Sequence, residues 1–105
     1  MNAPFLLTPQ ATEDLDAIWW FISKDSRAAA DRVEMEIVAT CRRLAKRPLI
    51  GTKRQDITQL PVRFWTVTKF PNYVIVYRAE TTPLQVVAVL HGKRDLKEVL
   101  ESRLR

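Results

Sequence analysis

The densest group of reactive side chains lies near the C-terminus, where the chain reads His91-Gly92-Lys93-Arg94-Asp95. An imidazole, two cations and a carboxylate follow a run of apolar residues and surround a flexible glycine. If the group is functional, it lies at the end of a strand and contacts a polar target there. In a structural interpretation, Asp95 caps a last helix and pairs with Lys93 or Arg94. The residue types by themselves leave both interpretations open.

Several other polar residues could take part in the same chemistry as this group. Cleavage of RNA without a metal needs a base for the 2′-hydroxyl proton, an acid for the leaving oxygen and cations for the phosphate. These types are supplied by Arg63, Tyr77, Arg78, His91 and Lys93. They share a surface only if the strands that carry them pair in order and in the right register. Tyr77 is otherwise a core tyrosine that packs its ring.

Metal chemistry is not expected. The chain has one cysteine and one histidine, which is too few for a zinc or iron ligand set. Cys41 falls on the apolar side of a predicted helix, where a thiol behaves as a small buried hydrophobe. We therefore expect neither a metal nor a cofactor.

The N-terminal part is predicted to form a strand and two helices. Residues 5–7 form a short strand, after which Thr8 supplies an N-cap hydroxyl and Pro9 occupies the first helical position. Asp25 or Ser26 caps a second helix that ends before Pro48. The short gap makes the two helices an antiparallel hairpin. Their core-facing stripes are Leu15, Ile18, Trp19 and Ile22 in the first helix, and Ala30, Val33, Ile37, Cys41 and Leu44 in the second.

Beyond residue 60 the apolar period changes from 3.6 to 2. Residues 49–60 form a loop, and strands follow over 62–69, 73–79 and 84–91. Short turns join them into an antiparallel meander, and Leu96, Val99 and Leu100 mark a short final helix. The sequence thus predicts a single α+β domain over residues 1–105. Its order is β-α-α-β-β-β with a short C-terminal helix, the helix hairpin packing on a mainly antiparallel sheet.

Composition and charge narrow the function classes. With 105 residues, 47% apolar and 28% charged, the chain is typical of one globular domain. It has no apolar run of the ~20 residues that a membrane helix needs. The N-terminus lacks the layout of a secretory signal, so we expect a cytoplasmic protein. Residues 1–40 carry a net charge of −4 and residues 41–105 carry +9, which favours an acidic partner, a polyanion or both.

The order of elements resembles the RelE/ParE superfamily of bacterial toxins, and most closely ParE. The resemblance covers about residues 5–100 and is carried by Arg63, by residues 72–78 and by the ending Val89-Leu90-His91-Gly92-Lys93-Arg94-Asp95. It implies the toxin of a type II toxin–antitoxin pair, associated with plasmid stabilisation and growth inhibition. It also implies a cognate antitoxin that is acidic and partly disordered when free and that binds the toxin in a hetero-oligomer. A membrane is not among the implied partners.

The resemblance implies one of two targets. ParE members act on DNA gyrase without being enzymes, whereas RelE-like members are ribosome-dependent messenger RNA endonucleases. RNA-cleaving relatives usually carry further aromatic or catalytic groups near the C-terminus, and no aromatic residue follows Tyr77 here. This favours gyrase, with the nuclease as the alternative through His91, Tyr77, Arg63 and Arg78. The expected target-binding residues are Arg63, Arg78, His91, Lys93 and Arg94.

Four apolar residues lie off the helix stripes, namely Trp20, Phe21, Met35 and Val38. They form either a second packed face or a surface that binds the antitoxin. A third class of function, a module that binds nucleic acid directly, would need aromatic residues between the cations for base stacking. Trp65 and Tyr73 are the plausible ones.

Overall fold

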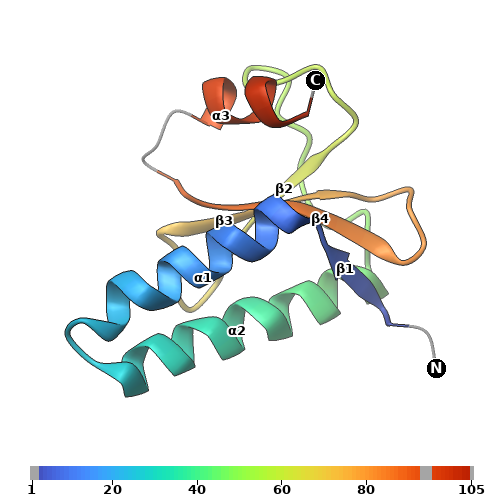
Figure 1. Cartoon of the computed structure of the whole chain (residues 1–105). Helices are drawn as coiled ribbons and strands as arrows, with labels where there is room; N and C mark the ends of the chain where they lie inside the picture. Colours follow the sequence, from blue (N-terminus) through green and yellow to red (C-terminus); the bar gives the residue numbers. More distant parts are fainter. Residues whose placement is uncertain (1–2, 93–95, 105) are drawn as a thin grey trace.

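The computed structural model describes residues 3–92 and 96–104 and places seven elements along them (Figure 1). In chain order they are β1 (Phe5–Leu7), α1 (Pro9–Ser23), α2 (Arg27–Lys46), β2 (Arg63–Thr66), β3 (Tyr73–Arg78), β4 (Leu84–His91) and α3 (Leu96–Arg103). None of these helices is long and apolar enough to cross a membrane. The predicted α+β class and the order of elements are confirmed.

The strands form one sheet in the order β1-β4-β3-β2. The pairs β2–β3 and β3–β4 are antiparallel, as the short turns predicted. The strand β1 pairs with β4 in parallel, with Phe5 opposite Leu84. A parallel pair needs a long crossover, and the helix hairpin with the following strands provides one.

Both helices of the hairpin begin at side-chain caps. The hydroxyl of Thr8 accepts a hydrogen bond from the Ala11 amide at 3.1 Å, and that of Ser26 accepts one from the Ala29 amide at 3.1 Å. Of the two caps considered for α2, Ser26 is therefore the one used. Each cap satisfies an amide that the first helical turn leaves without a partner.

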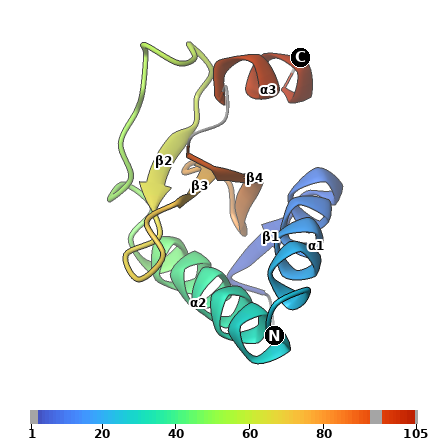
Figure 2. The same cartoon turned by 90° about the vertical axis from the view of Figure 1, so that its left-hand side faces the viewer.

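The sheet is covered on both faces (Figure 2). The helix hairpin packs on one face, where the buried cluster includes Leu15, Ile37 and Ile75. The helix α3 and the loop before β2 cover the other face. The consecutive residues Val87 and Ala88 both belong to the second cluster, because the β3–β4 register shifts between Val76 and Tyr77. The strand β4 is buried almost throughout because it lies inside the sheet and both faces are covered.

Two sequence predictions are wrong in detail. Trp19 was assigned to the core stripe, but it is only partly buried and its Nε1 donates to Asp31 of α2 at 2.8 Å. At 100° per residue, Trp19 lies on the flank of α1 that faces α2 rather than the sheet. The second strand ends at Thr66 instead of residue 69, because the Phe70 amide bonds back to the Val67 carbonyl in a turn.

An ion pair that the sequence did not reveal fastens α3 to the rest of the fold. The guanidinium of Arg103 donates from Nη1 and Nη2 to the two carboxylate oxygens of Asp14, and the Nη2–Oδ1 distance is 3.1 Å. The same carboxylate accepts the Val89 amide at 3.0 Å. Because β1 pairs with β4 only as far as Val86, this contact also satisfies part of the open β4 edge.

Candidate functional site

The end of β4 carries the histidine singled out in the sequence. His91 pairs with Tyr73 of β3, and their rings meet edge to face with centroids 5.8 Å apart. The Gly92 amide donates to the Asn72 carbonyl at 2.7 Å, which closes this end of the hairpin. His91 is half-buried rather than sealed in the core. The predicted residues Lys93, Arg94 and Asp95 lie outside the described residues.

Tyr77 and Arg63 lie at the other end of the strands, directly opposite each other in the β2–β3 pair. The Tyr77 side chain is fully buried. Its hydroxyl donates to the Pro48 carbonyl at 2.7 Å and accepts the Gly51 amide at 2.8 Å. Burial raises the pKa of Tyr77, and the Gly51 amide and the Arg63 charge offset only part of that rise. The phenol is therefore a neutral anchor for the loop.

The guanidinium of Arg63 donates hydrogen bonds to the same loop. Its Nη1 donates to the Gly51 carbonyl at 2.8 Å and more weakly to the Leu49 carbonyl at 3.4 Å. Together Arg63 and Tyr77 hold residues 48–51, which we call the strapped loop. A side chain at Gly51 is excluded, since a Cβ there would lie 2.3 Å from the Tyr77 hydroxyl oxygen. The sequence offered only a weak signal for this arrangement, a glycine within a basic loop.

Arg78 faces a different surface. It pairs with Gln85 at the start of β4 and lines a polar pocket of about 240 Å³ with Thr8, Gln10 and Arg103. Along β3, Arg78 is five positions from the residue opposite His91, which corresponds to roughly 17 Å. The structure therefore brings Arg63 and Tyr77 together but does not gather them with Arg78 and His91 on one surface.

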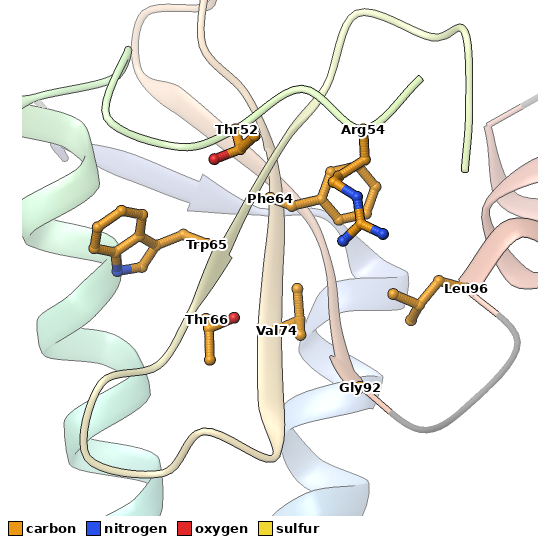
Figure 3. Close-up of a pocket in the computed structure, with 8 residues that line it drawn as sticks. All are labelled: Thr52, Arg54, Phe64, Trp65, Thr66, Val74, Gly92 and Leu96. Carbon is orange, nitrogen blue, oxygen red and sulfur yellow. The ribbon is translucent and has the colours of Figure 1, made fainter. Parts of the chain in front are cut away.

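A second pocket opens between β2, β3 and α3 (Figure 3). Its volume is about 380 Å³, and Phe64, Val74 and Leu96 supply its apolar lining. The Arg54 side chain extends into it from the loop. That guanidinium also forms a bidentate ion pair with Asp56, at 2.8 and 3.0 Å, which lowers the pKa of the Asp56 carboxyl. The pocket thus combines an apolar base with a cation that already has a carboxylate partner.

Six cations are exposed at the C-terminal end of α2 and in the loop after it, namely Arg42, Arg43, Lys46, Arg47, Lys53 and Arg54. Arg43 is paired with Glu36 at 3.0 Å and also donates to the Thr40 hydroxyl at 2.9 Å. Lys46 and Arg47 are exposed at the end of the helix, where cations are favoured by its dipole. This end of α2 borders a pocket of about 240 Å³ lined by Arg43, Leu44, Lys46, Arg47, Ile50, Trp65 and Thr68.

The four apolar residues predicted to lie off the stripes separate into two groups. Trp20, Phe21 and Met35 are 66–71% exposed. Val38 instead packs against the main core and is partly buried. Trp20 and Met35 lie about 180° from the core-facing sides of their helices, by their positions in the helical repeat. The outer surface of the hairpin is therefore apolar at several points.

Within residues 3–92 and 96–104, no three His, Cys, Asp or Glu side chains are placed to hold a metal ion. Cys41 is buried, as predicted, and burial raises the pKa of its thiol to about 12. That thiol is packed as part of the core beneath α2.

A strand, a helix hairpin and an antiparallel meander follow one another in the order that the resemblance to the RelE/ParE superfamily implied. The family model described as "ParE toxin of type II toxin-antitoxin system, parDE" matches residues 5–96. The chain therefore belongs to the ParE toxin family, and the resemblance stated from the sequence is confirmed.

The solved structures include a similar fold. A chain from a structure described as "Chromosomal ParDE TA system from P. aeruginosa" is 21% identical, with a TM-score of 0.67. The match covers 83% of this chain and 92% of that chain. At this identity the likeness shows a common fold. The search of curated proteins found no match.

Proposed function

We propose that this protein is the toxin of a type II toxin–antitoxin pair, that it inhibits DNA gyrase, and that a cognate antitoxin neutralises it. The observation that carries the proposal is membership of the ParE toxin family over residues 5–96. The protein acts as one domain in the cytoplasm, and the pair contributes to plasmid stabilisation by inhibiting growth when the antitoxin is lost.

The placement of the polar residues supports gyrase rather than RNA as the target. A nuclease would need its base, its acid and its phosphate-binding cations around one scissile bond. Tyr77 is buried with its hydroxyl bonded to the strapped loop, and Arg63 donates to the same loop. Arg78 lies at the opposite end of the β3–β4 hairpin from His91. Of the proposed target-binding residues, His91 is half-buried at the end of β4, and Lys93 and Arg94 follow it closely in the sequence, so we propose this segment as the main contact with gyrase.

Two features support neutralisation by an antitoxin, namely the exposed apolar residues of the helix hairpin and the charge distribution along the chain. Trp20, Phe21 and Met35 present apolar area that a partner can bury. An acidic, largely unfolded antitoxin segment would gain affinity from that burial and would be attracted by the basic half of the chain. We expect a toxin–antitoxin hetero-oligomer whose association slows as the salt concentration rises.

Parallel assays distinguish the two targets. The purified protein is added to gyrase with plasmid DNA and, separately, to a translating extract, each with and without the antitoxin. We expect trapped DNA breaks and intact messenger RNA, with the breaks suppressed by the antitoxin. Codon-dependent cuts in the messenger RNA would overturn the gyrase assignment. Arg94→Ala should weaken growth inhibition at equal expression, and unchanged inhibition would remove that residue from the proposed site.

A further inference from the structure

The C-terminal end of α2 and the strapped loop form a surface separate from His91 and from the exposed apolar residues Trp20, Phe21 and Met35. It consists of Lys46, Arg47, Leu49 and Ile50 around the pocket lined by Leu44, Ile50 and Trp65, and we call it the α2 corner. Leu49 is 70% exposed and Ile50 is 37% exposed. Two large apolar side chains thus face solvent next to two exposed cations.

The α2 corner is held rigidly. Tyr77 and Arg63 contribute four hydrogen bonds to the carbonyls of Pro48, Leu49 and Gly51 and to the Gly51 amide. The Ile50 amide also bonds to the Arg47 carbonyl at 3.1 Å. Because the loop is already ordered, a partner that binds it pays little of the usual entropic cost of fixing a loop. The fold therefore keeps Leu49 and Ile50 exposed in a fixed position.

The size and charge of the α2 corner indicate the chemistry of its occupant. A pocket of about 240 Å³ is smaller than the ~300–1,000 Å³ of most small-molecule sites, and it suits one apolar side chain of a partner. Lys46 and Arg47 on its rim attract carboxylates. Arg43 is less available, because Glu36 and Thr40 already accept from it. An apolar anchor flanked by acidic residues would match this surface.

We infer that the α2 corner is where an acidic, amphipathic segment of the antitoxin docks, with one apolar side chain in the Leu44–Ile50–Trp65 pocket and its carboxylates on Lys46 and Arg47. This inference rests on the proposed neutralisation by an antitoxin, and it adds a contact to the one proposed at Trp20, Phe21 and Met35. The favoured occupant is a peptide rather than nucleic acid, because most of the surface that lines the pocket is apolar although Lys46 and Arg47 stand on its rim. Its one aromatic residue, Trp65, is partly buried against the core and offers little ring surface for base stacking.

The test uses the product of the neighbouring reading frame, purified as the candidate antitoxin, and measures its binding to the full chain over a range of salt concentrations. The charge variant is K46E/R47E, and K46Q/R47Q keeps the test available if charge reversal disturbs the end of the helix. The matched control is R27E/R32E, which reverses two exposed cations at the other end of α2. We expect the charge variant to associate about tenfold more slowly at low salt and to lose most of its salt dependence. The control should stay within about twofold of the original chain.

The apolar contact is tested with Leu49→Ser, with Leu6→Ser as a control at another exposed leucine. Leu49→Ser should speed dissociation about tenfold, and Leu6→Ser should leave it unchanged. Normal antitoxin binding by the α2 corner variants would overturn the inference while leaving the proposed function intact. The inference also fails if these variants lose gyrase inhibition and keep antitoxin binding, since the surface would then belong to the target. If the original chain does not bind the candidate antitoxin, the proposed neutralisation fails as well.

Discussion

The two faces of the sheet are closed by different means. On the hairpin face, two capped helices bury a continuous cluster that includes Leu15, Ile37 and Leu44. On the opposite face, the short helix α3 contributes the fully buried Leu100 and is fastened by the Arg103–Asp14 ion pair. The first face is closed by apolar burial between long helices and the sheet, and the second adds to a smaller apolar cluster one polar contact between distant parts of the chain. We therefore expect the second face to open at a lower free-energy cost.

The largest expected effect tests the hairpin face. Ile37→Ala should lower the free energy of unfolding by about 2–5 kcal/mol, because it leaves a cavity at a fully buried position. Urea unfolding followed by circular dichroism measures this loss. Trp19→Ala should cost less, since Trp19 is partly exposed and outside the buried cluster. An equal or greater loss for Trp19→Ala would contradict this account of the hairpin.

The ion pair on the second face is tested by Asp14→Asn. The change removes the charge that holds Arg103 and should cost roughly 1.5–3 kcal/mol. Hydrogen exchange should show the loss locally, as faster exchange in α3 and at the Val89 amide. Asp16→Asn, at an exposed position of the same helix, is the control. Unchanged protection of α3 in the Asp14 variant would show that apolar packing alone holds this helix.

The strapped loop connects the two faces and should respond to Tyr77→Phe. Without the hydroxyl, the Pro48 carbonyl and the Gly51 amide lose their partner, at a cost of about 1–2 kcal/mol. Tyr73→Phe removes a hydroxyl from the same strand and provides the comparison. Chemical denaturation of both variants measures the difference. Similar losses in the two would indicate that the loop is not held by Tyr77.

The smallest effect is a dependence on pH. Because burial raises the pKa of Cys41 from 9.0 to about 12, the thiol stays protonated in the folded chain at a pH where the unfolded chain releases its proton. Stability from this thiol is complete below pH 9 and is lost as the pH rises from 9 towards 12. Between pH 8 and pH 10 the original chain should lose about 1 kcal/mol more unfolding free energy than Cys41→Ala does. Parallel losses in the two chains would contradict burial of the thiol.

Much of the architecture could be predicted because its causes are local. The Thr8 and Ser26 caps, the helical stripe through Ile37 and the change of period near residue 60 each depend on neighbouring residues alone. The short turns then required β2, β3 and β4 to pair in order. Trp19 was misplaced because a helical period of 3.6 does not say whether the edge of a stripe faces the sheet or the other helix.

The candidate site was less predictable, because its geometry depends on register and on long-range contacts. Residue types alone could not show that Tyr77 and Arg63 bind residues 48–51, or that Arg78 lies at the opposite end of the β3–β4 hairpin from His91. The amino-acid sequence by itself determined the family, the elements and the separation of charge, since these follow from residue type and spacing. Only the tertiary structure decided which side chains meet, because the strand register, the bulge in β4 and the Asp14–Arg103 contact join residues far apart in the chain.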